Sequence, residues 1–349
     1  MADTLVERED PALAIDVAAL ERYLSGRLPG FAPPLRARKF AGGQSNPTYL
    51  LEAGEQRWVL RKKPPGPLLA TAHMVDREHR VFSALHGRGV PVPKPFLYCE
   101  DRAVVGTEFF VMEHVQGRIF WDPTLPEVAS AAERSALYDE MNRVLCALHT
   151  LDYAACGLAD YGKPGNYFAR QIKRWTQQYE SAKTDQLPEM DRLIAWLPEN
   201  VPADDQTTLV HGDFRLDNMI FHPSEPRVLA VLDWELSTLG HPFADVAYNC
   251  MPYHVSSRGA PRLDGVAGKD SGIPTQAEYV AQYCQRTGRD GISGFAFYLA
   301  FSFFRSASIL QGVYHRGLQG NASSREGAKE MRARTIESAQ TGVRIIERA

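Results

Sequence analysis

The most constraining feature of this 349-residue chain is a polar loop between two short apolar runs, followed by a third apolar run. The first part reads Leu-Val-His-Gly-Asp-Phe-Arg-Leu-Asp-Asn-Met-Ile-Phe over residues 209–221, and the second reads Val-Leu-Ala-Val-Leu-Asp-Trp-Glu over residues 228–235. Short apolar runs on either side of a turn predict a β-hairpin. Antiparallel pairing across the turn is expected to place Asn218 opposite Asp233, with Asp213 on the loop just before the hairpin.

These three polar residues indicate phosphoryl-transfer chemistry. Two carboxylates and an amide at one end of a small sheet supply the oxygen ligands that Mg²⁺ prefers. In protein kinases, a loop aspartate accepts the proton of the substrate hydroxyl, while an asparagine and a second aspartate hold the metal ions. The string H-G-D-x-x-x-x-N, followed by D-W-E, has the same order. We therefore expect Asp213 to be the catalytic base and Asn218 and Asp233 to bind the metal.

This motif resembles that of the aminoglycoside phosphotransferase and choline kinase-like family. The resemblance implies an α+β, two-lobed protein kinase-like fold. Its N-terminal lobe has a five-stranded antiparallel sheet plus a helix, and its mainly helical C-terminal lobe carries the catalytic hairpin. The resemblance also implies ATP and Mg²⁺ as cofactors. On this pattern, residues 1–115 form the nucleotide-binding lobe and residues 116–349 form the catalytic and substrate lobe.

The N-terminal third has the segments that such a lobe needs. Strands are expected at residues 36–41, 48–53, 57–62, 96–99 and 107–113, and a helix at residues 73–86. The glycine-containing loop at residues 42–46 makes Gly43 and Ser45 candidates for binding ATP phosphates through backbone N–H groups. By the resemblance, Arg61 is the phosphate-binding cation of the third strand and Glu78 is its partner on the helix. Strand alternation sends Lys62 to the opposite face, and Lys62 stays an alternative to Arg61.

The resemblance assigns further residues around this centre. Backbone groups near Glu113 and Val115 correspond to the hinge that binds the adenine edge. His211 and Asp245 correspond to support for the catalytic loop. Two other candidates are Arg215, as a contact to a phosphate or a shield for the base, and Glu235, as a holder of a metal-bound water.

Downstream of the hinge, the apolar periodicity is helical. Helices are expected at residues 125–150, 165–181, 188–196, 244–253, 276–287 and 294–315, and a last helix is expected to run to about residue 348. Arg170, Lys173 and Arg174 lie away from the apolar side of the second of these helices. They form either a solvated face or a surface that receives an anionic substrate. The segment 256–274 is rich in Gly, Pro, Ser and charge, which is typical of a substrate lid or recognition loop.

Bulk properties exclude several classes of protein. A net charge of −3 indicates neither a nucleic-acid partner nor a membrane surface. The five cysteines are scattered without metal-binding spacing, which is typical of free thiols in a reducing, cytoplasmic compartment. The charged N-terminus does not read as a signal peptide. The apolar run at residues 295–304 is too short to span a membrane and predicts a buried helix.

The leading functional hypothesis is ATP-dependent phosphorylation of a small-molecule hydroxyl. The strings GGQSNPTYL, VLRKKPPG and GNASS resemble a subgroup found alone in bacteria or fused to acyl-CoA dehydrogenase modules. That subgroup is linked to phosphorylation of hydroxyacyl-CoA thioesters, including 4-hydroxyacyl-CoA. The resemblance thus implies an acyl-CoA alcohol as the small-molecule partner and a functional link to an acyl-CoA dehydrogenase. Two alternatives stay open: another alcohol, such as an aminoglycoside, choline or a sugar, and a non-catalytic nucleotide-binding scaffold.

Overall fold

The structure is a computed structural model that describes residues 15–40, 46–65, 74–255, 262–268, 270–319 and 325–349. Internal contacts divide the chain into two compact units, which are described separately below. Unit 1 consists of residues 1–119, 156–158 and 217–236, and unit 2 consists of residues 120–155, 159–216 and 237–349. The expected lobes, residues 1–115 and 116–349, stay a prediction.

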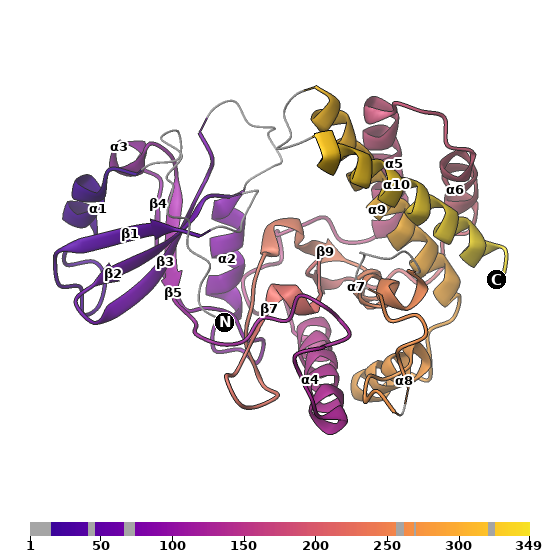
Figure 1. The fold of residues 1–349 in the computed structure, drawn as a ribbon, viewed down its shortest axis with the longest axis horizontal. Helices are drawn as coiled ribbons and strands as arrows, with labels where there is room; N and C mark the ends of the chain where they lie inside the picture. Colours follow the sequence, from indigo (N-terminus) through magenta and orange to yellow (C-terminus); the bar gives the residue numbers. More distant parts are fainter. Residues whose placement is uncertain (1–14, 41–45, 66–73, 256–261, 269, 320–324) are drawn as a thin grey trace. The chain divides into compact units, whose positions relative to one another are not determined.

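Unit 1 is built on a five-stranded antiparallel sheet (Figure 1). The strands are β1 (Leu35–Lys39), β2 (Thr48–Ala53), β3 (Gln56–Lys62), β4 (Pro95–Cys99) and β5 (Phe109–Glu113), in the order β1-β2-β3-β5-β4. Three helices accompany the sheet, namely α1 (Val17–Leu24), α2 (Val75–Leu85) and α3 (Arg102–Val105). The predicted five-stranded sheet with a helix is confirmed, whereas the short helix α3 was not expected.

The alternation of β3 determines which side chains reach α2. Trp58 and Leu60 are buried in an apolar cluster that includes residues of α1 and α3. Successive side chains of a strand point to opposite faces, so Val59 and Arg61 lie on the other face. On that other face Phe82 of α2 packs edge-on against Phe110 of β5, with ring centroids 5.8 Å apart. The sheet therefore presents Arg61 to the helix that carries Glu78.

The hairpin of β7 (Met219–Phe221) and β8 (Val228–Val231) also belongs to unit 1. Its register pairs Met219 with Val231, so the expectation that Asn218 faces Asp233 is wrong by one residue. The backbone N–H of Leu232, rather than a group of Asp233, donates to the Asn218 carbonyl at 2.8 Å. At the turn, the His222 N–H donates to the Arg227 carbonyl at 2.7 Å and Phe221 pairs with Val228, which is two residues from the expected register. The irregularity between Ile220 and Phe221 then shifts the pairing back by one residue.

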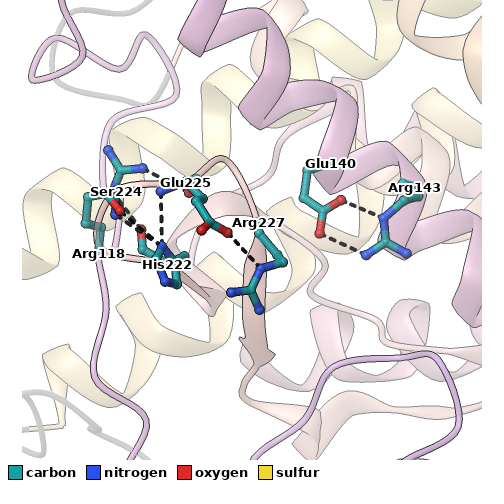
Figure 2. Close-up of polar contacts among 7 residues, drawn as sticks. All are labelled: Arg118, Glu140, Arg143, His222, Ser224, Glu225 and Arg227. Atoms are coloured by element: carbon teal, nitrogen blue, oxygen red, sulfur yellow. Dashed lines mark hydrogen bonds and ion pairs between the residues drawn. The ribbon is translucent and has the colours of Figure 1, made fainter.

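The turn of this hairpin is held by side chains (Figure 2). The His222 Nδ1 accepts hydrogen bonds from the backbone N–H groups of Ser224 at 3.3 Å and Glu225 at 3.1 Å. Arg118 donates from Nε to the His222 carbonyl at 3.0 Å and from Nη2 to the Glu225 carbonyl at 3.1 Å. Because these bonds fix the six-residue turn, they also fix the register of the strands that it joins.

Unit 2 is mainly helical, as predicted. Its helices are α4 (Ala131–Thr150), α5 (Tyr167–Ala182), α6 (Pro188–Glu199), α7 (Pro242–Asn249), α8 (Gln276–Thr287), α9 (Phe295–Leu318) and α10 (Arg325–Ile346). A small antiparallel pair, β6 (Thr208–Val210) and β9 (Thr238–Gly240), accompanies them. α9 packs against α5, α7 and α10, and α10 runs along it (Figure 1).

Two helices of unit 2 differ from their predicted bounds for local reasons. α4 begins at Ala131 rather than near residue 125, because Leu125 has a left-handed backbone with φ of 53° and the Ser130 hydroxyl caps the helix at Glu133 N. Farther along α4, Arg143 donates two bonds to Glu140, at 2.5 and 2.8 Å (Figure 2). α7 ends at Asn249, and a 3₁₀ turn, Met251–His254, follows.

The long apolar helix α9 is a core element. Its first two turns bury Phe297, Tyr298 and Phe301. No helix in the described part of the chain combines the length and the apolar character that crossing a bilayer requires.

The described part of the segment 256–274 belongs to unit 2 and is packed within it. Leu263 and Ile273 are buried, and Arg134 of α4 donates from Nε to the Ser271 carbonyl at 2.5 Å. Residues 256–261 and 269 lie outside the described residues. The hypothesis that this segment is a substrate lid stays a prediction.

Candidate active site

Arg61 is the centre of the polar cluster in unit 1. Its Nη1 lies 3.1 Å from Glu78 Oε1 of α2, and its Nη2 donates to Asp233 Oδ1 at 3.0 Å. One guanidinium thus joins three elements that are far apart in the sequence, namely β3, α2 and the end of the hairpin. The fork geometry of arginine allows two separate carboxylates to be bound at once.

Burial and charge both act on this cluster. The Glu78 side chain is only 1% exposed. Burial raises the pKa of Glu78 to about 7, although the positive charge of Arg61 opposes that shift. Burial alone would lower the pKa of Arg61, but the carboxylates of Glu78 and Asp233 more than offset this effect and raise it. Arg61 is therefore a permanent cation held in a fixed position by its two partners.

The structure separates Arg61 from Lys62. The Lys62 side chain is buried on the other face of the sheet, and its Nζ donates to the Val105 carbonyl of α3 at 2.8 Å. Desolvation lowers the pKa of Lys62. Since Arg61 contacts Glu78 and Lys62 does not share that face, Arg61 is the better candidate for the phosphate-binding cation.

The hairpin contributes the expected metal-binding groups. Asn218 is buried at the end of a 3₁₀ turn, Leu216–Asn218, directly before β7. Asp233 follows β8 and has a left-handed backbone, with φ of 64°. Glu235 lies in the next 3₁₀ turn, Trp234–Leu236, which is anchored by the buried Trp234 ring through a bond from Nε1 to the Val231 carbonyl at 3.0 Å.

Four other residues of unit 1 were predicted to bind ATP. Gly43 and Ser45 lie outside the described residues. Glu113 ends β5, where its backbone N–H donates to the Lys94 carbonyl at 2.9 Å and its carboxylate accepts from Lys94 N at 3.1 Å. Val115 follows β5 on a segment without regular secondary structure. Their contact with adenine stays a prediction.

In unit 2, the loop that follows β6 is held by Asp245. This carboxylate, on the first turn of α7, accepts the backbone N–H groups of His211 at 2.6 Å and Gly212 at 2.8 Å. Gly212 has φ of 84°, a conformation that glycine adopts without strain. The loop therefore bends at Gly212, and Asp245 fixes the backbone of both His211 and Gly212.

Asp245 is itself part of a buried network. His149 of α4 lies with Nε2 at 3.3 Å from Asp245 Oδ2, and its Nδ1 lies 2.9 Å from the Tyr283 hydroxyl of α8. Burial alone would raise the pKa of Asp245, but the hydrogen bond from His149 and the charges around it lower it. The network joins three helices to the loop.

Asp213 lies on this loop, where its backbone and its carboxylate both make polar contacts. Its backbone N–H donates to His211 Nδ1 at 3.1 Å. The Tyr248 hydroxyl of α7 donates to Asp213 Oδ1 at 2.5 Å, and Arg215 Nε lies 3.3 Å from the same oxygen. Burial, and secondly the negative charge of Asp213, raise the pKa of Tyr248, so this phenol stays protonated and donates.

Tyr248 and Asn249 were missed by reasoning from the sequence. Asn249 Nδ2 donates to the Phe214 carbonyl at 2.9 Å, which fixes the loop just after Asp213. A signal existed for Tyr248, because it lies three residues after Asp245 and residues at that spacing share one face of a helix. The bond between His149 and Asp245 could not be read from the sequence either.

Comparison with known proteins agrees with this architecture. Residues 36–294 match the model of the phosphotransferase enzyme family. A solved structure from Ralstonia eutropha JMP134, named a candidate aminoglycoside phosphotransferase, is 49% identical with a TM-score of 0.88, covering 96% of this chain and 99% of that one. The fold and these matches define a kinase-like phosphotransferase with an alcohol group as acceptor. The chain belongs to the phosphotransferase enzyme family.

Two further matches extend the comparison. Acyl-CoA dehydrogenase family member 10 of Mus musculus is 51% identical over 316 residues. The match covers 89% of this chain but only 29% of the mouse protein, so the chain corresponds to a part of that protein. A thermostable mutant aminoglycoside phosphotransferase, solved in ternary complex with ADP and hygromycin B, is 14% identical with a TM-score of 0.59, covering 93% of this chain and 99% of that one. At that identity it shows a shared fold.

Proposed function

We propose that this chain transfers the γ-phosphate of ATP, with Mg²⁺, to the hydroxyl of a small alcohol, and that the alcohol is a hydroxyacyl-CoA of the 4-hydroxyacyl-CoA type. The observation that carries the proposal is the ion-pair cluster of unit 1, in which Arg61 contacts both Glu78 and Asp233. Burial of a cation costs free energy, and a strand cation paired with a helix glutamate is the arrangement by which protein kinases direct a cation at the nucleotide phosphates.

The proposed roles follow from the local geometry. Asp213 accepts the proton of the acceptor hydroxyl, and its loop is held by Asp245 and Tyr248. Arg61, positioned by Glu78, binds the nucleotide phosphates. Because only Phe214–Asp217 separates Asp213 from Asn218, the chain itself joins the proposed base to the proposed metal ligands.

The donor set is appropriate for Mg²⁺. Asn218 and Asp233 supply an amide oxygen and a carboxylate, and no group of three or more His, Cys, Asp or Glu residues among the described positions forms a dedicated metal cage. Mg²⁺ typically takes one or two carboxylates and completes its shell with water and substrate phosphates. Bound Mg·ATP supplies the transferable phosphoryl group with part of its charge neutralised.

The acyl-CoA part of the proposal rests on the curated relatives. Proteins named as acyl-CoA dehydrogenase family members contain a part that is about half identical to this chain. A phosphotransferase on the same polypeptide as an acyl-CoA dehydrogenase is most simply explained by a shared acyl-CoA substrate. We extend that explanation to this chain, and with it a functional link to an acyl-CoA dehydrogenase.

The test is release of ADP from Mg·ATP in the presence of 4-hydroxyacyl-CoA, choline, a sugar and an aminoglycoside. We expect turnover with the hydroxyacyl-CoA, a loss of about 10²–10⁴-fold in kcat in Asp213→Asn, and unchanged kcat in Asp290→Asn, an exposed surface carboxylate. Turnover of another alcohol alone would replace the acyl-CoA assignment. If neither the wild type nor Asp213→Asn releases ADP with any of these alcohols, although both still bind ATP, the chain is a nucleotide-binding scaffold.

A second arm tests the nucleotide-binding cluster. Arg61→Gln is expected to raise the KM for ATP at least tenfold, because charge-assisted hydrogen bonds are worth roughly 1.5–3 kcal/mol. Arg57→Gln, an exposed position on the same strand, is the matched control and is expected to leave that KM unchanged. Equal effects of the two substitutions would contradict the assignment of Arg61.

A further inference from the structure

Arg305 of α9 is a buried cation close to the catalytic loop. It is only 6% exposed, although it follows a run of apolar residues in the core of unit 2. Among the described residues, no carboxylate forms an ion pair with it. Its recorded contacts are with two aromatic rings, Trp175 of α5 at 5.6 Å and Tyr248 of α7 at 5.5 Å from Cζ to the ring centroid. Burial of a cation without a carboxylate partner is costly, which makes Arg305 a candidate for binding an anion.

A second arginine lies on the same indole. Arg174 is exposed on α5, and its Cζ lies 5.1 Å from the centroid of the Trp175 ring. Surrounding protein atoms, and secondly the positive charge of Arg305, lower the pKa of Arg174. Two guanidinium groups therefore share one aromatic ring and repel each other. Such an arrangement is stabilised when an anion binds between or beside the two cations.

This pair of arginines is next to the proposed base. Arg305 stacks on the ring of Tyr248, and the hydroxyl of that same tyrosine donates to Asp213 Oδ1 at 2.5 Å. A single tyrosine side chain thus separates the cation from the carboxylate that receives the acceptor hydroxyl. All of these residues belong to unit 2.

The geometry points to an anion subsite for the acceptor, formed by Arg174 and Arg305 on Trp175. The inference rests on the proposed function and makes it narrower, because the acceptor is then an alcohol that carries a carboxylate or a phosphate. Choline and aminoglycosides are cations, and this subsite selects against them. The shared chemistry of the ligand is an oxyanion, and its source is either the carboxylate of a free hydroxy acid or the phosphates of a CoA thioester.

The test uses two matched pairs of acceptors with Mg·ATP. One pair is 4-hydroxypentanoate and its methyl ester, which differ in a carboxylate. The other pair is 4-hydroxypentanoyl-CoA and 4-hydroxypentanoyl-pantetheine, which differ in the CoA phosphates. In the wild type, we expect kcat/KM for the charged member of one pair to exceed that for its neutral counterpart at least tenfold. The pair that shows this preference identifies the source of the anion.

Substitutions of Arg174 and Arg305 test whether these residues cause the preference for the charged acceptor. We expect Arg305→Gln to lower kcat/KM at least tenfold for the charged acceptor and less than twofold for its neutral counterpart, with the KM for ATP unchanged. Arg305→Lys keeps the charge and should restore part of the loss. Arg174→Gln should give a loss of at least threefold on the charged acceptor alone. If Arg305→Gln does not fold, Arg174→Gln is measured in its place, because Arg174 is exposed and its replacement is not expected to disturb the core. Arg192→Gln, an exposed arginine of α6, is the control.

The measurements distinguish an anion subsite from an effect of Arg305 on the catalytic loop or on stability. Equal losses on charged and neutral acceptors would show that Arg305 acts on the loop or on stability, and would overturn the subsite. If the wild type phosphorylates none of the four compounds, the proposed function fails with these acceptors. The subsite is then judged by calorimetric binding of the same compounds in the presence of Mg·ADP. Weaker binding of the charged member alone in both arginine variants would support it, and equal or absent binding would overturn it.

Discussion

The Glu78 carboxyl is expected to lose its proton near pH 7 in the folded protein. This carboxyl is fully buried on α2, 3.1 Å from the Arg61 guanidinium. Two effects compete, because burial disfavours the carboxylate while the neighbouring cation favours it. Burial is the larger effect and raises the pKa of Glu78 from 4.5 to about 7. Replacement by glutamine, which keeps the shape and cannot ionise, measures which effect dominates.

The size and sign of the effect follow from linkage between protonation and folding. A pKa that rises from 4.5 to about 7 on folding corresponds to roughly 3 kcal/mol. The folded state then binds more protons than the unfolded state between these values, so the contribution of Glu78 is present at low pH and is lost as the pH rises through 7. Relative to Glu78→Gln, the wild type is expected to lose roughly 2–3 kcal/mol of unfolding free energy between pH 5 and pH 8.

The assay is urea denaturation of the wild type and Glu78→Gln at pH 5, 6, 7 and 8, without nucleotide or Mg²⁺. Glu55→Gln, in the exposed turn between β2 and β3, is the matched control and should show no pH-dependent difference from the wild type. If the difference between wild type and Glu78→Gln stays constant over this range, the ion pair with Arg61 dominates and the reasoning from burial is refuted.

Two other predictions concern stability and the shape of the catalytic loop. Asp245→Asn places an amide where the carboxylate accepts N–H groups of His211 and Gly212, and should cost about 2 kcal/mol or more of unfolding free energy. It should also lower kcat, and full activity with unchanged urea denaturation would contradict that role. Thr275→Ala removes the capping box of α8 with Glu278 and should cost about 1 kcal/mol without changing kcat. Thermal denaturation checks it, and an unchanged midpoint would contradict the prediction.

Local signals in the sequence were sufficient for much of the fold. β2 at Thr48–Ala53 and α8 at Gln276–Thr287 have the bounds that the sequence pattern predicts. Such signals depend on a few neighbouring residues, so they can be read without the structure. The kinase-like arrangement of elements was predicted from the family resemblance that the catalytic motif carries.

Features that depend on distant partners could not be read in this way. The register of the catalytic hairpin depends on the irregularity after Ile220 and on Arg118, which bonds to His222 from 104 positions away. The contact of Tyr248 with Asp213 depends on where α7 lies relative to the loop. Arg305 reads in the sequence as the end of an apolar run, whereas the structure buries it between two aromatic rings. A sequence pattern contains no information on which ring a buried cation meets.

The discontinuous make-up of unit 1 has a consequence for synthesis of the chain on the ribosome. Residues 1–119 contain the whole five-stranded sheet, but the hairpin that completes the unit lies at residues 217–236. Arg61 and its partner Asp233 are 172 positions apart. During translation, all five strands of the sheet are therefore made before Asp233, and Arg61 lacks this partner until about half of the remaining chain has been synthesised. A polypeptide of residues 1–119 would lack the hairpin and therefore the Asp233 carboxylate that pairs with Arg61.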